Sequence, residues 1–259
     1  MASRPPLSVV IITLNEEHNI ARCIKSLRWA EEILVMDSHS TDRTRGIAEE
    51  LGARVENKDW MGYGQQKNYA SSLVKHDWIF YIDADEECGI GLQKEIEDFL
   101  GKNGVMQGTQ YWGASFPRKT FFLGRWIMHG GWYPNILTRL SHKKYGYWTE
   151  PAVHEALELS EGPIYRMKND LLHYTFRDVG DQVITNVKFS RLGAKVAKNK
   201  GEKRSIGKIF CKPIGKFLET YFWKLGFLDG LPGLVISINA AHSIFMKYVE
   251  LYFEKNSRC

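Results

Sequence analysis

Short apolar runs alternate with helix-like segments along the N-terminal third of the chain. Four runs, at 7–13, 32–36, 53–56 and 78–82, are rich in β-branched and aromatic residues and too short for free-standing helices, so they predict buried strands. Between the first two runs, apolar residues recur at helical spacing, at Ile20, Cys23, Ile24 and Leu27. A second helix is expected to open at Trp60–Asn68 and to run to about Val74. Strands alternating with helices predict right-handed βαβ units and a mostly parallel sheet, so the fold class is α/β.

Polar residues directly follow three of these strands. Asn15 and Glu16 follow the first, the segment 37–44 follows the second, and Asp83 ends the fourth run. In open α/β sheets ligands bind outside the carboxyl ends of the strands, so these clusters are expected to converge on one edge. The carboxylates and hydroxyls of 37–44 suit hydrogen bonds to a base and a ribose. Asn15 and Glu16 either cap the following helix or contact the ligand.

The densest acidic stretch is Asp83-Ala84-Asp85-Glu86-Glu87. Two carboxylates separated by one small residue direct oxygen ligands at one hard cation. Mg²⁺ or Mn²⁺ typically takes one or two carboxylates together with substrate phosphates. The alternative is a solvated acidic turn that caps a helix beginning near Gly91. At this point both interpretations stay open.

Composition and missing motifs exclude several classes of protein. The chain has 259 residues, a net charge of +5 and four cysteines without CxxC spacing, which argues against a zinc site or a disulfide framework and fits a reducing cytoplasm. Neither GxGxxG nor GxxxxGK followed by Ser or Thr occurs, so dinucleotide-dependent redox enzymes and P-loop enzymes lose their main support. No signal peptide is expected.

Cations concentrate near the C-terminus, where eleven lie between Lys188 and Lys224 against only Glu202 and Glu219. Beyond about Gly180 the pattern predicts helices, and the most apolar part, 231–246, is shorter than the ~20 residues needed to span a bilayer. Apolar helix faces flanked by lysines bind anionic membrane surfaces, so this part is expected to lie on a membrane. The alternative is a packing or dimerisation appendage. No nucleic-acid-binding signature accompanies the lysines, so no nucleic acid partner is expected.

Several motifs occur together in a fixed order. They are Leu14-Asn15-Glu16-Glu17, DSHSTDRT at 37–44, GYGQQKN at 62–68 and Asp83-Ala84-Asp85-Glu86. This combination resembles the GT-A glycosyltransferases of family 2. Further motifs are similar to the bacterial lipopolysaccharide core β-1,4-glucosyltransferase subgroup, namely GGWYP at 130–134, Arg139-Leu140, Val153-His154-Glu155 and LHYT at 172–175. The resemblance covers roughly residues 7–190. One difference is His39, where many relatives carry glycine.

The resemblance implies roles for particular residues. Asp85 and His173 would bind Mg²⁺ or Mn²⁺, and Glu155 would be the general base. The donor would be bound by Asn15, Glu16, Asp37, Lys67, Asp83 and Arg139. Taken alone, three of these residues have simpler interpretations. His173 has the apolar neighbours of a core histidine, Glu155 could begin a helix, and Lys67 could project into water.

The resemblance also implies a domain plan and a function. A GT-A catalytic domain is expected at 1–180, with a nucleotide-sugar half to about 105 and an acceptor half at about 106–180, followed by a basic amphipathic helical region at 181–259. The implied activity is metal-dependent, inverting transfer of a hexose, most simply glucose from UDP-glucose, to a lipopolysaccharide inner-core saccharide. Because the QxxRW motif of processive synthases is absent, one sugar would be added.

Alternatives are another lipid-linked acceptor or a catalytically silent membrane scaffold. The expected location is the cytoplasm, peripheral on the cytoplasmic face of the inner membrane. Together, Asp83, Asp85, Glu155 and His173 argue against a silent protein.

Overall fold

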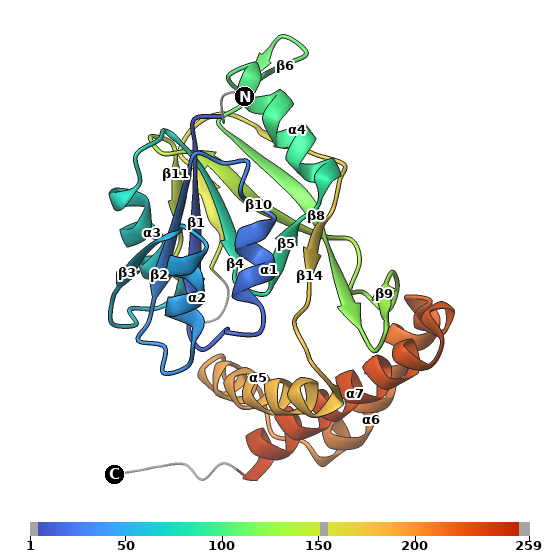
Figure 1. The fold of residues 1–259 in the computed structure, drawn as a ribbon. Coiled ribbons are helices and arrows are strands. Elements are labelled where there is room, and N and C mark those ends of the chain that lie inside the picture. Colours follow the sequence, from blue (N-terminus) through green and yellow to red (C-terminus); the bar gives the residue numbers. More distant parts are fainter. Residues whose placement is uncertain (1–4, 151–154, 254–259) are drawn as a thin grey trace. The chain divides into compact units, whose positions relative to one another are not determined.

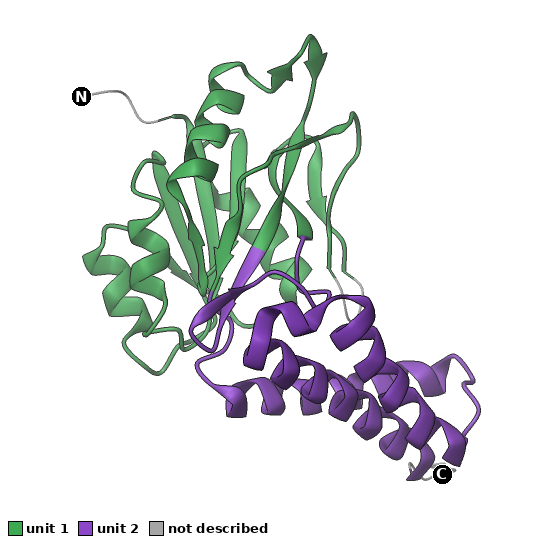
Figure 2. Cartoon of the chain, turned by 90° about the vertical axis from the view of Figure 1, so that its right-hand side faces the viewer, with its two compact units in different colours: residues 1–118, 135–173 green, residues 119–134, 174–259 purple. Residues whose placement is uncertain are grey.

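A computed structural model describes residues 5–150 and 155–253. The chain divides into two compact units (Figure 2). Unit 1 comprises residues 1–118 and 135–173, and unit 2 comprises residues 119–134 and 174–259. Unit 2 therefore takes a segment from the middle of the chain in addition to the C-terminal helices.

The predicted strands form one side of a large sheet (Figure 1). They are β1 (Leu7–Thr13), β2 (Glu32–Asp37), β3 (Arg54–Asn57) and β4 (Trp78–Asp83). All three pairings among them are parallel, in the order β3-β2-β1-β4. Because β1 lies between β2 and β4, the carboxyl ends of these strands are neighbours: Thr13 is opposite Asp37, and Ile12 is opposite Asp83.

The rest of the sheet is antiparallel in most of its pairings. It continues through β10 (Asn135–His142), β8 (Gly113–Phe122), β14 (Leu171–His173) and β5 (Glu86–Cys88), with β9 (Arg125–Ile127) and β13 (Ile164–Arg166) paired to β8. Two small two-stranded sheets join β6 (Val105–Met106) to β7 (Thr109–Gln110) and β11 (Gly146–Trp148) to β12 (Leu157–Leu159). The fold is the GT-A-like α/β fold that the resemblance implied, with a mixed sheet where a mostly parallel one was expected.

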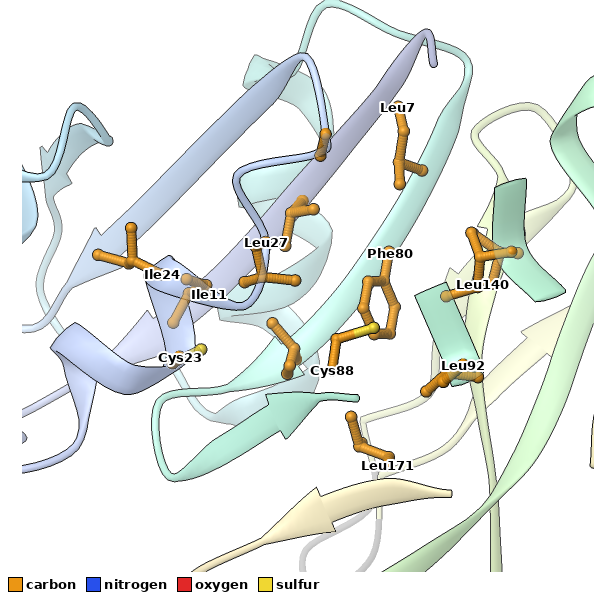
Figure 3. Packing of buried hydrophobic residues seen from close by; sticks show 14 of the residues in the cluster. Leu7, Ile11, Cys23, Ile24, Leu27, Phe80, Cys88, Leu92, Leu140 and Leu171 are labelled. Carbon is orange, nitrogen blue, oxygen red and sulfur yellow. The ribbon is translucent and has the colours of Figure 1, made fainter. Parts of the chain in front are cut away.

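Strand alternation divides the core of unit 1 into two layers. Leu7, Val9 and Ile11 of β1 pack with helices α1 (Ile20–Lys25), α2 (Thr44–Glu50) and α4 (Ile90–Gly101) in one apolar cluster (Figure 3). Val10 and Ile12 point to the other face and pack with α3 (Tyr63–Leu73). Successive side chains of a strand point to opposite faces, so a strand that is apolar throughout requires helices on both sides of the sheet.

Unit 2 is mainly helical. Its helices are α5 (Val179–Asn199), α6 (Ile206–Leu218) and α7 (Gly230–Phe253), with a π-helical turn at Glu219–Trp223 and a 3₁₀ turn at Gly226–Asp229. Helix α7 packs against both α5 and α6. In the part of the chain that the structure describes, no helix is long and apolar enough to cross a membrane.

A buried acid fastens the β9 segment to the helices within unit 2. Asp229 is fully buried, and its carboxylate accepts hydrogen bonds from the backbone N–H groups of Met128 (3.1 Å) and His129 (2.7 Å). Arg125 lies 3.5 Å from the same carboxylate. The next backbone N–H, that of Gly130, donates to the carbonyl of Lys224 at 2.8 Å. The conformation of the GGWYP motif is thus set by contacts with the C-terminal helices.

Candidate active site

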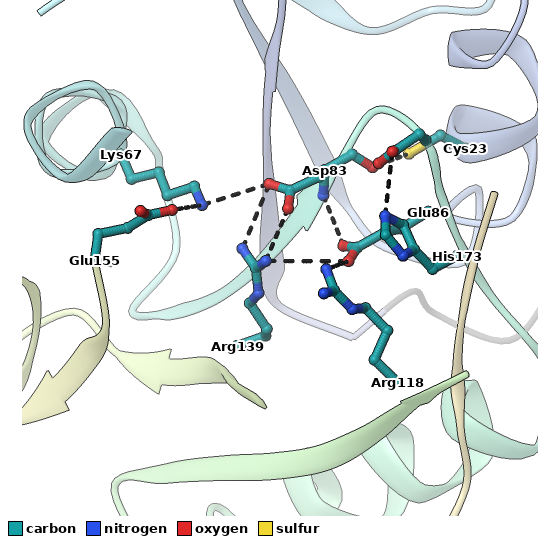
Figure 4. A network of polar contacts seen from close by, with 9 residues as sticks. Cys23, Lys67, Asp83, Glu86, Arg118, Arg139, Glu155 and His173 are labelled. Atoms are coloured by element: carbon teal, nitrogen blue, oxygen red, sulfur yellow. Dashed lines mark hydrogen bonds and ion pairs between the residues drawn. The ribbon is translucent and has the colours of Figure 1, made fainter. Parts of the chain in front are cut away.

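Asp83, the last residue of β4, is the centre of a network of charged side chains in unit 1 (Figure 4). The guanidinium of Arg139, from β10, donates from Nη2 to Oδ2 at 2.8 Å and from Nη1 to Oδ1 at 3.4 Å. Lys67 Nζ, from α3, lies 3.4 Å from Oδ1. The Asp83 side chain is 29% exposed, so its carboxylate still reaches solvent.

Lys67 is a buried lysine between two carboxylates. Its side chain is only 2% exposed, and Nζ lies 3.4 Å from Glu155 Oε1 as well as from Asp83. The ammonium group also lies 4.2 Å from the centroid of the Trp148 ring, which supplies a cation–π contact. Lys67 therefore does not project into water. Its ammonium group pairs with both Glu155, the candidate base, and Asp83, a candidate donor-binding residue.

Gly64 allows helix α3 to pack closely against the backbone at Thr149. A Cβ atom at Gly64, in the first turn of α3, would collide with the backbone carbonyl of Thr149. In addition, the side chain of Asn68 exchanges hydrogen bonds with the backbone of Trp148, both at 2.9 Å. The GYGQQKN motif thus seats α3 against the strand that carries Trp148.

Burial and charge act in opposite directions on this network. Burial raises the pKa of Asp83, but the charges of Arg139 and Lys67 outweigh it and hold that pKa well below its usual range. Burial lowers the pKa of Arg139, and the charges of Asp83 and Glu86 more than compensate, so this pKa is raised. For Lys67, burial lowers the pKa and the charges of Asp83 and Glu155 offset this only in part.

Glu86 lies beneath the acidic turn and is fully buried. Its carboxylate accepts a hydrogen bond from the backbone N–H of Asp83 at 2.9 Å. It also forms an ion pair with the guanidinium of Arg118 at 3.1 Å. These contacts fix the backbone at the point where the strand ends. The sequence placed Glu86 in the acidic stretch without a role. The sequence did not indicate a role for Arg118, because its contact with Glu86 forms only when strand β8 lies next to the acidic turn.

Asp85 and His173 are brought together from distant parts of the chain. His173 Nε2 lies 3.2 Å from Asp85 Oδ2. His173 ends β14, which pairs antiparallel with β5 so that His173 is opposite Glu86. Asp85 does not cap α4, whose N-cap residue is Gly89 and has no side-chain cap hydrogen bond.

A carboxylate oxygen is a ligand that Mg²⁺ and Mn²⁺ prefer, and an imidazole nitrogen is a common ligand of divalent transition-metal ions, so this pair fits a divalent cation and suits Mn²⁺ better than Mg²⁺. Within residues 5–150 and 155–253, no group of three or more His, Cys, Asp or Glu side chains is arranged to hold a metal. A cation at Asp85 and His173 would therefore take its remaining ligands from substrate and water, as Mg²⁺ usually does.

A second polar cluster joins the ends of β1 and β2. Asn15 Oδ1 accepts the backbone N–H of Thr41 at 2.8 Å, and the buried Asp37 accepts the backbone N–H of Ser40 at 2.8 Å. Asn15 has a left-handed φ of 55° and does not cap α1, which begins at Ile20 after Asn19. The capping interpretation of Asn15 is therefore wrong, because its side chain is used to connect two loops.

Glu16 and His39 support the same loops. The backbone N–H of Glu16 donates to Thr44 Oγ1 at 2.7 Å, while its carboxylate accepts from Asn19 at 2.8 Å. His39 has φ 63°, a left-handed conformation that favours glycine, the residue that the resemblance led us to expect at this position. Of the motif at 153–155, Val153 and His154 lie outside the described residues, whereas Glu155 is described.

Tyr63 is a further residue of the site that the sequence did not single out. It begins α3, and its ring meets that of Trp60 edge-on with centroids 4.7 Å apart. Burial raises the pKa of the Tyr63 phenol, and the charges of Glu155, Asp83 and Asp85 raise it further. About half of the Tyr63 surface stays exposed. Its position in the GYGQQKN motif could have indicated Tyr63 as a candidate site residue.

Comparisons with known proteins agree with this architecture. The model of glycosyl transferase family 2 matches residues 8–149. A glycosyltransferase of Rickettsia conorii is 32% identical over 95% of this chain and 89% of its own length. The lipopolysaccharide core biosynthesis glycosyltransferase LpsC of Rhizobium meliloti is 28% identical over 96% of this chain and 95% of its own length.

A solved structure of glucosyl-3-phosphoglycerate synthase from Mycobacterium tuberculosis, in complex with Mn²⁺, UDP and glucosyl-3-phosphoglycerate, is also similar. It has a TM-score of 0.48 and 19% sequence identity, and the match covers 78% of this chain and 82% of that one.

Proposed function

The chain belongs to glycosyl transferase family 2 and is a glycosyltransferase, and from this premise we propose that it transfers one hexose from a UDP-sugar, with a divalent cation, to a lipopolysaccharide core saccharide. The observation that carries the proposal is the arrangement around Asp83. Two buried cations, Lys67 and Arg139, hold two partly exposed carboxylates, Asp83 and Glu155, at the carboxyl edge of the parallel strands.

Donor binding is assigned to the residues at the ends of β1, β2 and β4. Asp37 would accept hydrogen bonds from the uracil or ribose, with Asn15 and Glu16 shaping the loop beside it. Asp83, held ionised by its cations, would accept hydrogen bonds from the ribose. When bound at Asp85 and His173, Mg²⁺ or Mn²⁺ supplies charge stabilisation for the diphosphate leaving group.

Glu155 is proposed as the general base. Inverting transfer needs a carboxylate that takes the proton of the acceptor hydroxyl while the sugar carbon is attacked from the face opposite the nucleotide. Glu155 is 24% exposed, so an acceptor can reach it, and Lys67 restrains its carboxylate from one side. Lys67 and Arg139 are buried, so they act as positioning residues for Glu155 and Asp83.

The acceptor class rests on the similarity to the LpsC protein, whose name gives lipopolysaccharide core biosynthesis. Such an acceptor is carried by a lipid. We therefore place the reaction at the cytoplasmic face of the inner membrane, with the chain bound peripherally.

Thermal unfolding with UDP-glucose, with and without Mn²⁺, tests the donor site. A ligand that binds only the folded state at a hundred times its dissociation constant stabilises it by about 2.7 kcal/mol. We expect stabilisation that needs Mn²⁺ and that disappears in Asp85→Ala and His173→Ala. The matched control is Asp98→Ala, an exposed acid on α4, which should respond as the wild type does. Equal stabilisation of Asp85→Ala, or none of the wild type by any UDP-sugar with metal, would contradict the proposal.

A further inference from the structure

Helix α6 exposes a continuous apolar stripe. Its members recur every fourth residue and continue into the π-helical turn, at Ile206, Phe210, Ile214, Leu218 and Phe222. Residues four apart lie on one face of a helix. Phe210 is 62% exposed, and Trp223, directly after Phe222, is 86% exposed. A contiguous exposed apolar surface of this kind marks an interaction site.

The stripe is not needed to fold α6. The opposite side of this helix carries the buried Ile209, which packs in a cluster with Ala194 and Ala197 of α5 and with Tyr248 and Leu251 of α7. Helix α6 therefore already has its partners within unit 2. The exposed stripe is a second apolar face of α6, which the packing of unit 2 leaves uncovered.

Helix α6 also carries three lysines at the same spacing, on the side away from the stripe, where Lys208 lies over the ring of Tyr248. Lys208, Lys212 and Lys216 also recur every fourth residue, and Lys212 is exposed. Over 188–224, eleven cations face two acids. Glu202 pairs with Lys208, and Glu219 pairs with Lys216 and Lys224. The excess of positive charge that this segment keeps favours an anionic occupant.

We propose that the surface formed by Ile206, Phe210, Ile214, Leu218, Phe222 and Trp223, called here the α6 stripe, docks onto an anionic phospholipid bilayer. Aromatic and aliphatic side chains on one face with lysines on the other are typical of helices that lie in the plane of a membrane interface. Exposed tryptophan suits the level of the lipid headgroups. A second copy fits less well, because a symmetric contact through this face would bring together two copies of the same positively charged segment.

The stripe differs from the segment that hydropathy alone indicates. Residues 231–246 are the most apolar part of the C-terminal region, but their exposure is mixed: Ile236 is buried within unit 2, whereas Leu231 and Ile238 are exposed. We assign docking to the less hydrophobic α6, because its exposed apolar residues form one continuous row. This inference rests on the proposed function, which places the chain peripherally on a membrane, and deepens it by naming the surface that docks. Docking involves no sugar or metal and is measured without either, so its failure is distinct from failure of the donor site.

Sedimentation of the full chain with lipid vesicles tests the proposal. Vesicles of phosphatidylcholine and phosphatidylglycerol in equal parts are compared with vesicles of phosphatidylcholine alone, and Phe210→Glu and Ile214→Glu are compared with the wild type. We expect the wild type to bind the anionic vesicles, and each variant to bind roughly tenfold more weakly or worse, because an apolar contact is lost and an anion is introduced. The matched control is Ile90→Glu, at an exposed isoleucine of α4 in unit 1, which should bind as the wild type does.

Two further measurements keep the result interpretable. Thermal unfolding of each variant, and its stabilisation by UDP-glucose with Mn²⁺, should match the wild type, because the substituted side chains are exposed. Lys212→Glu should weaken binding to anionic vesicles. Wild-type binding that Phe210→Glu and Ile214→Glu leave intact would overturn the proposal, as would no vesicle binding by the wild type. Loss of a dimer in these variants, by size-exclusion chromatography and without a change in vesicle binding, would identify a second copy as the occupant and also overturn it.

Discussion

Charged side chains are usually exposed and apolar ones buried, and each unit departs from one half of this rule. Unit 1 buries charge, since Lys67, Arg139 and Glu86 all lie beneath its surface at the ends of the central strands. Unit 2 exposes apolar side chains, of which Phe210 and Trp223 on the α6 stripe are the clearest. An unpaired buried charge costs several kcal/mol, so the charges of unit 1 persist only because they are paired. Exposed apolar side chains carry no comparable penalty, but they form a surface that binds.

Catalysis and surface docking therefore depend on different features of the two units. A network of paired charges holds carboxylates in fixed positions, which is what donor binding and proton transfer require. An apolar surface needs area and little geometric precision. Asp229 shows that burial of an acid alone does not make a site, because its carboxylate is engaged by two backbone N–H groups and by the side chains of Arg125 and His129, and its role is to position a loop.

The largest effect is expected from Glu155→Gln. Removing the base while keeping its shape should reduce the rate of transfer roughly 10²- to 10⁴-fold and leave donor affinity unchanged. Single-turnover transfer and donor titration measure the two quantities separately. Glu161→Gln, an exposed acid nearby in sequence, is the control. Full activity of Glu155→Gln would assign the base to another residue.

Arg139→Met should destabilise unit 1 substantially. It removes the guanidinium that donates two hydrogen bonds to Asp83 and lies 4.0 Å from the buried Glu86, and breaking a buried pair in this way costs roughly 3 kcal/mol. Urea unfolding gives the free energy of unfolding. Arg45→Met, at an exposed arginine of α2 paired with Glu49, should leave it unchanged. Equal stability of Arg139→Met and the wild type would show that the network is solvated.

Asp229→Asn is the equivalent change in unit 2 and should have a smaller effect, about 2 kcal/mol. An amide oxygen still accepts hydrogen bonds from the Met128 and His129 N–H groups, although it loses the strength that charge adds. Urea unfolding is again the measurement, with Glu250→Gln in α7 as the control. A loss larger than that of Arg139→Met would reverse the comparison between the units.

The smallest effect is one of pH. The pKa of Asp83 is lower in the folded chain than its ordinary value of 3.8, so its ionisation stabilises the fold fully above that value, and this contribution is lost as the pH falls toward the folded pKa. The difference in unfolding free energy between the wild type and Asp83→Asn should therefore shrink as the pH falls below about 4. A difference that stays constant down to acid pH would mean that Asp83 has an ordinary pKa.

The sequence predicted the strands of unit 1 well because their patterns are local. Leu7–Thr13 was predicted at its observed bounds, and the run 78–82 ended one residue before β4 does. The mixed sheet was not predicted, since the antiparallel strands after Gly113 lack a clear period and their register is set by pairing across the chain. The same limit hid Arg118, whose partner Glu86 lies 32 residues away in sequence.

The sequence by itself determined the α/β class, the acidic strand end at Asp83 and Asp85, and the family, because each depends on residue types at short spacing. The tertiary structure decided which side chains meet. It buried Lys67 between Asp83 and Glu155, brought His173 to Asp85, and turned one row of apolar residues of α6 outward while covering Ile209 on the other side of the same helix. Periodicity states that a helix has an apolar face, but only packing shows whether another element of the chain covers it.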